Sequence, residues 1–438
     1  MNIVEIYSES AVLEQLAEKL GGRQSRVHVD GMSGSMPAAV VAALAVKMPT
    51  ANQMVIAPSK EDAYYMAGDL EALADSMSGT ALAPKVMLFP TSYRKAYNYD
   101  TDQTDNSNVL MRGETVKALA AGERCVVVTY PEALSEKVVA PAVLGDNTLR
   151  LARGQQMEMD DLIDRLQELG FEREDFVVEG GQFAVRGGIV DVYSLASEHP
   201  CRIEFFGDEI ESLRTFDAAT QLSVKQLDRV DLVGTCRNEP DKSGDEKPSD
   251  SSDNNKVSLL AYFASTDVVW SQSLTLTAER LESILAETGK AYEARLADTV
   301  HTIVGRLPKP EEVSCPANEM LREMLKMRIV EYGNSHYFSQ AVPLKVDSEP
   351  QPAFGKQFEM LKANLEEYAD RDYRMLITVS GDSQEKRLMK ILPESFSSRF
   401  AVFNLSHGFI DHSNKVLCYT DHEIFERYHK YSVRTPNA

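Results

Sequence analysis

The sequence has few cysteines, a shortage of basic side chains and no long apolar run. Its five cysteines are far apart and form no C-x-x-C pair, which suits a reducing cytosol. No stretch reaches about 18 uninterrupted apolar residues, and the N-terminus has no basic segment ahead of an apolar core. We therefore expect a cytoplasmic protein that neither crosses a membrane nor is exported.

The charge balance argues against direct binding to nucleic acid. With 67 acidic and 46 basic side chains, the formal net charge is −21 at pH 7, which repels a phosphate backbone unless a basic patch is concentrated somewhere. We find no such patch. Residues 93–108 contain tyrosines that could stack on bases, but their charged side chains are mostly aspartates, which favours a polar connecting loop. A direct DNA-binding module is the weaker alternative.

No group of side chains indicates a metal site or a nucleophilic active site. Half of the eight histidines lie near the C-terminus, but their spacing does not repeat on one helix face, and no cysteine lies at ligand spacing beside them. No Ser-His-Asp or Cys-His arrangement can be assembled from the sequence. We expect no catalytic residue, no metal and no cofactor. The four C-terminal histidines are His407, His412, His422 and His429.

The first 149 residues alternate between predicted strands and helices, which is typical of a parallel sheet. The first strand leads into the glycine-bearing loop GMSGSMPAA and then into an alanine-rich helix, the place where P-loop proteins cradle phosphate. Aligned from Gly31, the P-loop pattern has Met36, Pro37 and Ala38 where it needs a glycine, a lysine and a hydroxyl. The later strand ending at Trp270 is followed by SQS instead of an Asp-Glu pair. We predict a degenerate nucleotide loop without hydrolysis.

Residues 150–235 are predicted to form an α+β domain whose antiparallel strands are separated by glycine-containing turns. Alternation along the strands places Arg186, Arg202 and Phe206 on the outer face of the sheet. Arginine with an aromatic ring is the composition of a protein-docking hot spot. Such residues are also common on surfaces by chance, and the pattern alone leaves both interpretations open.

The pattern as a whole predicts an α/β multidomain protein. A degenerate P-loop, RecA-like parallel-sheet domain is split by the inserted α+β domain and followed by a small α/β domain. A mobile linker without large apolar residues follows the inserted domain. The predicted divisions are 1–149 for the first part of the sheet domain, 150–235 for the inserted domain, 236–256 for the linker, 257–347 for the second part of the sheet domain and 354–430 for the small domain.

Two stretches carry a resemblance to a known family. FAVRGGIVDVY followed by EHPCRIEFFGDEIESLRTFD closely resembles the second domain shared by the excision-repair protein UvrB and the bacterial transcription-repair coupling factors. The resemblance extends more loosely along most of the chain, through GMSGSMPAA at the nucleotide loop, VVVTYPEAL, LLAYF and the closing HGFID. Two departures from UvrB favour the coupling factors. The nucleotide loop has no lysine, and the segment between Tyr97 and Arg112 is too short for the DNA-inserting hairpin of UvrB.

The resemblance implies a non-catalytic UvrB-like module that binds UvrA through its second domain. The family's contact residues correspond to Arg186, Arg202 and Phe206. It also implies that RNA polymerase and DNA are bound by parts of a longer protein, of which this chain would be the N-terminal portion. The alternative is an ATP-dependent damage-verification helicase component like UvrB.

Overall fold

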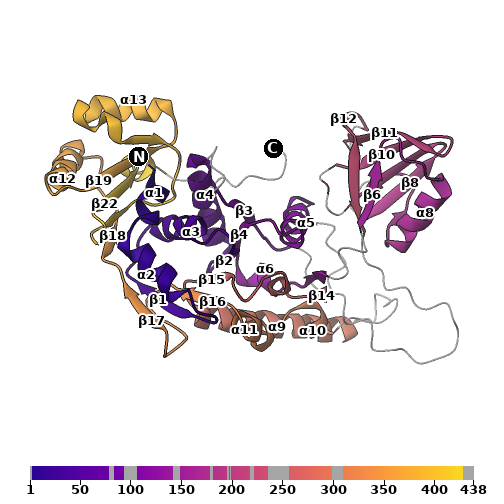
Figure 1. The fold of residues 1–438 in the computed structure, drawn as a ribbon, viewed down its shortest axis with the longest axis horizontal. Coiled ribbons are helices and arrows are strands. Elements are labelled where there is room, and N and C mark those ends of the chain that lie inside the picture. The colour runs from indigo at the N-terminus through magenta and orange to yellow at the C-terminus, as the bar shows by residue number, and fades with distance from the viewer. Residues whose placement is uncertain are drawn as a thin grey trace.

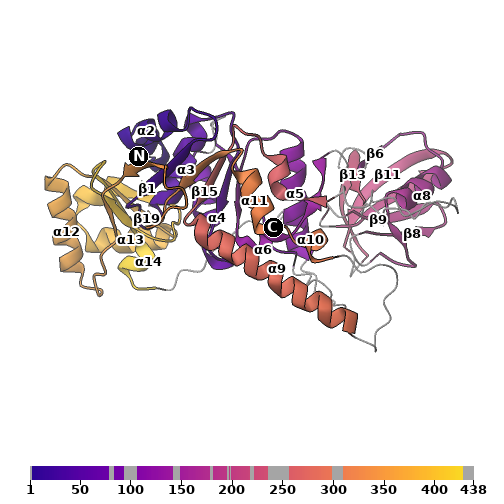
Figure 2. The same ribbon diagram turned by 90° about the horizontal axis from the view of Figure 1, so that it is seen from below.

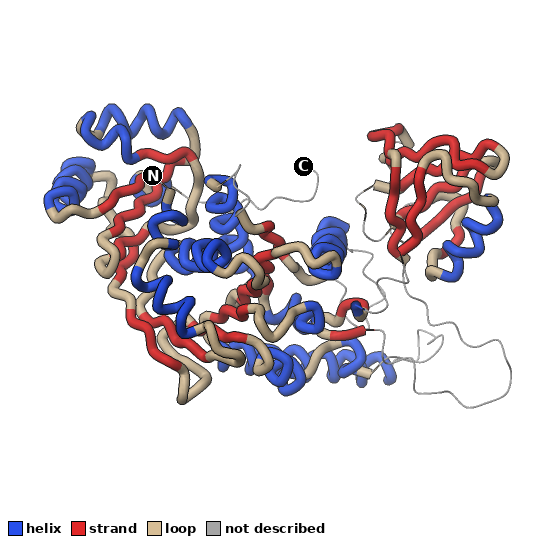
Figure 3. Tube along the Cα trace, viewed as in Figure 1, coloured by secondary structure: helices blue, strands red, loops and turns tan. Residues whose placement is uncertain are grey.

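The computed structural model describes residues 2–77, 83–92, 106–141, 148–177, 181–194, 197, 199–217, 221–234, 256–297 and 309–427. Figure 3 shows their strands gathered into separate groups, with helices around the larger ones. The predicted loop at 93–108 and linker at 236–256 lie almost entirely outside the described residues, as does His429.

A seven-stranded parallel sheet forms the largest unit (Figure 1), in the order β17-β1-β16-β15-β2-β4-β3. The inner strands β2, β15 and β4 are short and fully buried, because both faces of a parallel sheet are covered by helices, whereas the edge strand β17 is largely exposed. The strands are β1 (Arg26–Asp30), β2 (Gln53–Ile56), β3 (Lys85–Leu88), β4 (Cys125–Thr129), β15 (Val268–Ser271), β16 (Arg328–Glu331) and β17 (Val342–Lys345).

The helices of this unit are amphipathic, apart from α3 (Met36–Lys47), in which residues 36–45 are all buried. Pro37 lies in the first turn of α3, where its missing N–H has no partner to lose. Figure 2 shows α9 (Leu274–Ala297) extending away from the sheet. The other helices are α1 (Ile3–Ser8), α2 (Ala11–Lys19), α4 (Lys60–Ser76), α5 (Asn106–Ala120), α6 (Pro131–Ser135), α10 (Pro310–Val313) and α11 (Ala317–Met324).

A second unit lies apart from the parallel sheet in Figure 1. Its six-stranded sheet has the order β12-β11-β10-β9-β8-β7, and a β13-β6 pair and helix α8 (Met159–Glu168) complete it. Leu162 and Leu166 of α8 are buried against the sheet. The strands are β6 (Thr148–Ala152), β7 (Glu172–Arg173), β8 (Gln182–Arg186), β9 (Ile189–Tyr193), β10 (Cys201–Phe206), β11 (Glu209–Phe216), β12 (Ser223–Leu227) and β13 (Arg229–Val233).

The last unit is a five-stranded sheet in the order β18-β21-β22-β19-β20, flanked by helices. Its residues Leu405, Phe409 and Cys418 belong to the same core as the parallel sheet, so the two units share buried surface. The elements are β18 (Ser348–Pro350), β19 (Arg374–Val379), β20 (Phe400–Val402), β21 (Phe409–Asp411), β22 (Val416–Thr420), α12 (Phe358–Asp370), α13 (Asp382–Ile391), α14 (Asp421–Ile424) and the 3-10 helix η3 (Glu394–Arg399).

The structure differs from the sequence prediction in small elements. The segment at 259–263, which its apolar run predicts as a strand, is the 3-10 helix η2 (Leu259–Tyr262), because Ser258 caps it by accepting the N–H of Leu260. It follows a short pair of strands, β5 (Val138–Val139) and β14 (Lys256–Val257). Mixed α/β architecture with a parallel sheet and further sheets is confirmed.

Candidate protein-docking site

The outer face of the second unit is built by cross-strand pairing. In the register of strands β8 to β11, Ala184 lies opposite Asp191, Asp191 opposite Arg202, and Arg202 opposite Arg214. Alternate residues of β10 point the other way, and Cys201 and Ile203 are buried in the core. The polar side chains of four strands therefore meet on one face.

Asp191 is the centre of this face. Its side chain is 1% exposed, and its carboxylate accepts Nε of Arg202 on Oδ1 at 2.7 Å and Nη2 of Arg202 on Oδ2 at 2.9 Å. Nη2 of Arg186 donates to the same Oδ2. The bond to Asp191 is also the main reason that the pKa of Arg202 is raised. One buried carboxylate thus holds both arginines.

The two arginines are less open to solvent than strand alternation predicts. The side chain of Arg202 is 14% exposed and that of Arg186 is 38% exposed. Arg202 also donates to Oε1 of Gln221 at 3.1 Å and lies 4.2 Å above the ring of Phe216. Asp191 and neighbouring rings thus partly cover both guanidinium groups.

Phe206, unlike the two arginines, is largely exposed to solvent. It ends β10 at the turn into β11, where Gly207 adopts a φ of 63° that favours glycine. The pairing with β11 shifts between Glu204 and Phe205, a bulge that changes the path of the strand just before the turn. Phe206 is 77% exposed, the highest value among the large apolar side chains of the described residues. An apolar ring held in water at a rigid turn is suited to filling a pocket on a partner.

Two further apolar side chains are exposed on this unit, and the sequence pattern does not indicate them. Phe176 is 57% exposed, and its ring lies 5.0 Å from the guanidinium carbon of Arg186. Leu222 is 69% exposed and follows Gln221, the residue that binds Arg202. Both lie in irregular segments, where no alternation indicates which side a residue takes.

A second ion pair lies beside the first. Arg214 donates to Glu204, which also accepts the hydroxyl of Ser212 at 2.5 Å. Arg202 and Arg214 are cross-strand neighbours of like charge, and each has a carboxylate of its own. With Arg186, three arginines lie on this face, and Asp191 and Glu204 are their carboxylate partners.

The glycine-bearing loop between β1 and α3 is covered by the last unit. The backbone N–H of Ser35 donates to the carbonyl of His407 at 3.1 Å, and the N–H of His407 donates to Oγ of Ser35 at 3.0 Å. Gly34 has a φ of 55°, and a Cβ at this position would collide with the carbonyl oxygen of Gly408. The segment at 405–408 therefore packs directly against this loop.

A buried carboxylate fixes this contact. Asp69 of α4 accepts the hydroxyls of Ser35 and Ser406 at 2.6 Å each, and the N–H of Ser406 at 2.6 Å. Burial raises the pKa of Asp69 to about 6, against the opposing effect of these hydrogen bonds. His407 makes an ion pair with Glu423 at the rim of the same contact, and its pKa is raised mainly by that bond.

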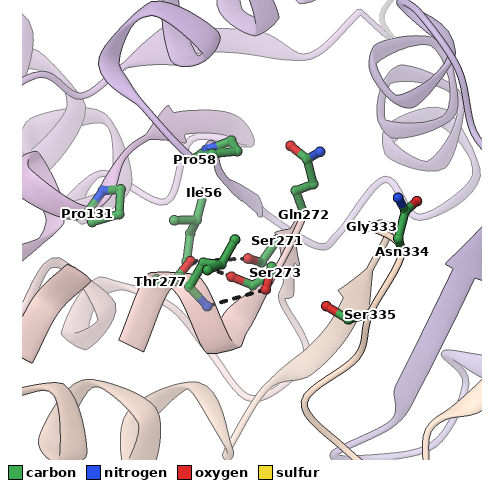
Figure 4. Close-up of a pocket in the computed structure, with 11 residues that line it drawn as sticks. Ile56, Pro58, Pro131, Ser271, Gln272, Ser273, Thr277, Gly333, Asn334 and Ser335 are labelled. Atoms are coloured by element: carbon green, nitrogen blue, oxygen red, sulfur yellow. Dashed lines mark hydrogen bonds between the residues drawn. The ribbon is translucent and has the colours of Figure 1, made fainter. Parts of the chain in front are cut away.

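A cavity of about 310 Å³ opens at the carboxyl ends of the parallel strands (Figure 4), the usual ligand position of an open α/β sheet. Ser271, Gln272 and Ser273 line it at the place where a nucleotide-driven motor has acidic residues. Its lining has hydroxyls and amides but no lysine, arginine or carboxylate, so it has no charge to hold a triphosphate and magnesium. The other lining residues are Ile56, Pro58, Pro131, Leu276, Thr277, Gly333, Asn334 and Ser335.

The described residues contain no group of three or more histidine, cysteine, aspartate or glutamate side chains that could hold a metal ion. Across the same part of the chain, every helix is too short or too polar to cross a membrane.

Comparison with known protein families gives a match for the second unit. Residues 149–236 match the family of the UvrB interaction domain. The chain is similar to transcription-repair-coupling factors. The one from Myxococcus xanthus is 35% identical over 222 residues, which are 50% of this chain and 18% of that protein. The one from Bacillus subtilis (strain 168) is 36% identical over 121 residues, which are 28% of this chain and 10% of that protein.

A longer alignment relates nearly the whole chain to the same proteins. The transcription-repair-coupling factor of Staphylococcus epidermidis (strain ATCC 12228 / FDA PCI 1200) is 22% identical over 455 aligned positions, which cover 90% of this chain and 36% of that protein. The chain thus spans 10% to 36% of the length of these coupling factors. The family resemblance predicted from the motifs is confirmed, and Arg186, Asp191, Arg202 and Phe206 all lie inside the matched UvrB interaction domain.

Proposed function

We propose that the chain is a non-catalytic UvrB-like module of a transcription-repair-coupling factor that recruits UvrA to DNA damage at a stalled RNA polymerase. The observation that carries the proposal is the outer face of the second unit, which combines an exposed ring at Phe206 with two arginines fixed by Asp191. This face lies within the residues that match the UvrB interaction domain.

The chemistry of the face fits a protein partner. A guanidinium group has five N–H donors, and the hydrogen bonds of Arg202 to Asp191 and Gln221 engage three of them, on Nε and Nη2. Nη1 is left to donate to a carboxylate of UvrA as a charge-assisted hydrogen bond. Arg186 uses only Nη2 in this way. Phe206 would fill an apolar pocket of UvrA between these polar contacts.

In this proposal the other units support the docking domain. Residues 1–149 and 257–347 form a degenerate P-loop, RecA-like domain, residues 150–235 form the UvrA-docking domain, residues 236–256 link the two, and residues 354–430 form a third domain. RNA polymerase and DNA would be bound by other parts of a longer, cytoplasmic protein. The covering of Ser35 by His407 supports a role without nucleotide.

A pulldown of cognate UvrA by the purified chain tests the docking role. The parent protein is expected to retain UvrA, and the variant carrying both Arg202→Ala and Phe206→Ala is expected to lose it. Equal retention by the two proteins would refute the site.

The alternative, a UvrB-like ATP-dependent helicase component, predicts ATP turnover by the same purified protein. The proposal predicts none above background. A direct DNA-binding module would shift duplex DNA in a salt-dependent manner, and the net charge of −21 predicts little or no shift.

A further inference from the structure

We propose that Asp191 is the positioning residue of the UvrA-docking face: it sets the spacing and orientation of Arg186 and Arg202 before the partner arrives. This inference rests on the proposed function. It adds a residue that makes no contact with the partner itself, since its side chain is 1% exposed.

The geometry allows Asp191 to hold two cations at once. Oδ1 accepts Nε of Arg202, while Oδ2 accepts Nη2 of both Arg202 and Arg186. The contact with Arg202 engages both carboxylate oxygens with two nitrogens of one planar group, which fixes its plane as well as its position. A long arginine side chain otherwise loses considerable rotamer entropy when it binds a partner.

Contacts with groups other than Asp191 also restrict the conformation of each arginine. Arg202 lies over the ring of Phe216 and donates to Gln221, and Arg186 lies 5.0 Å from the ring of Phe176. Each guanidinium is therefore held between a ring and the shared carboxylate, while N–H donors remain for a partner. The face is preformed rather than ordered on binding.

The strand pairing explains why this residue is suited to the task. Asp191 is on β9, opposite Arg202 on β10 and opposite Ala184 on β8. Ala184 is itself buried, and Arg186, two residues further along β8, reaches back to Asp191. The register thus places Asp191 directly opposite Arg202 and diagonal to Arg186, which pairs with Ile189.

Calorimetric titration with purified UvrA tests the inference in a double-mutant cycle on the full chain. Asp191→Asn keeps the side-chain volume and one acceptor oxygen but removes the charge, and we expect it to weaken UvrA binding at least about tenfold. In the background Arg186→Ala with Arg202→Ala, adding Asp191→Asn should change the affinity by less than about twofold, because no guanidinium remains to be positioned.

A matched control is Asp231→Asn. Asp231 is in the same unit as Asp191 but on strand β13, and its ion pair is with Lys117 of α5 in the parallel-sheet unit. This control should bind UvrA like the parent. Circular dichroism and thermal melting of every variant report whether it is folded. A purely structural effect of Asp191→Asn would persist undiminished in the arginine-free background, and that result would overturn the inference.

Arg202→Lys provides a second route if Asp191→Asn does not fold. Lysine keeps the positive charge but cannot bind both oxygens of Asp191 with a planar fork. We expect its loss of affinity to approach that of Arg202→Ala, and parent-like binding would overturn the inference. If Arg186→Ala with Arg202→Ala binds UvrA like the parent, the proposed docking site itself is wrong. If Asp191→Asn and Arg202→Lys bind UvrA like the parent while the double alanine variant does not, the docking site is supported and the positioning role is refuted.

Discussion

The backbone N–H of Ser35 donates to the carbonyl oxygen of His407 at 3.1 Å, and the N–H of His407 donates back to the Ser35 hydroxyl. A P-loop uses backbone N–H groups at this position to bind phosphate oxygens. Here a peptide carbonyl from the last unit takes one of those N–H groups. This loop, which has Pro37 where a P-loop has lysine, thus serves as a contact between two units of the chain.

Replacement of Gly34 should weaken this contact. Gly34→Ala combines a left-handed backbone, at a φ of 55°, with a Cβ directed at the Gly408 carbonyl. Gly122→Ala is the matched control, because its φ is 72° and nothing lies within 4 Å of its added Cβ. Both variants bear about 1–2 kcal/mol of backbone strain, and Gly34→Ala should bear roughly 1–3 kcal/mol more from overpacking. Thermal melting should show the lower Tm for Gly34→Ala, and equal melting temperatures would contradict the contact.

Asp69 should make the stability depend on pH. Burial raises its pKa from 3.8 to about 6, so the folded state binds a proton more tightly than the unfolded state. The protonated Asp69 carboxyl therefore stabilises the folded state. This stabilisation is fully present below about pH 4 and is lost as the pH rises through about 6. A shift of about two pH units corresponds to roughly 3 kcal/mol.

Urea unfolding of the parent and of Asp69→Asn between pH 4 and pH 7 measures this contribution. The free energy of unfolding of the parent, relative to the variant, should fall by up to about 3 kcal/mol over this range. The ion pair of His407 with Glu423 is present in both proteins, so the effect of Glu423 on the His407 titration cancels, while the interaction of His407 with Asp69 is part of the measured difference. A relative stability that is flat or that rises with pH would refute the assignment.

Phe206 should matter for binding and hardly at all for folding. Because its side chain is 77% exposed, Phe206→Ala should change the free energy of unfolding by less than about 0.5 kcal/mol. Loss of a hot-spot ring should weaken UvrA binding by about 2 kcal/mol or more, which is roughly 30-fold. Leu276→Ala is the control, since Leu276 is 60% exposed but lies on α9 of the sheet unit. Biolayer interferometry with immobilised UvrA measures the affinity of both variants. A similar loss of affinity for Phe206→Ala and Leu276→Ala would contradict a specific site.

Nucleotide should not stabilise the chain. A ligand present at about 100 times its Kd raises the stability of the folded state by roughly 2.7 kcal/mol, which appears as a higher Tm. With the loop covered by residues 405–408 and the cavity at Ser271 uncharged, millimolar ATP with magnesium should leave the Tm unchanged. A rise of several degrees that vanishes in EDTA would show that a nucleotide site persists.

Strand alternation and turn chemistry predict which side of the sheet Arg202 and Phe206 occupy, because that information is local. The partner of Arg202 is harder to predict from the sequence. Asp191 lies opposite Arg202 only in one register of β9 and β10, and the pattern IVDV does not say that one aspartate serves two arginines. The two glycine turns fix the β8–β9 and β10–β11 registers, but the connection between β9 and β10 at residues 194–200 contains no glycine turn that would fix theirs.

The covering of the nucleotide loop could not be predicted in this way. Ser35 and His407 are 372 positions apart, and their contact depends on how two units pack. The missing lysine at Pro37 indicates that the loop has lost its catalytic chemistry, but no local pattern indicates what replaces phosphate. The exposed Phe176 and Leu222 were missed for a similar reason, because irregular segments have no period.

The central claim, that one rigid face of the second unit binds UvrA, is tested most directly by calorimetric titration of UvrA into the full chain. The parent should bind with a saturable heat. Arg202→Ala combined with Phe206→Ala should reduce the affinity at least about 100-fold while the protein remains folded by circular dichroism, since two hot-spot side chains are lost. A folded double variant with the Kd of the parent would contradict the account.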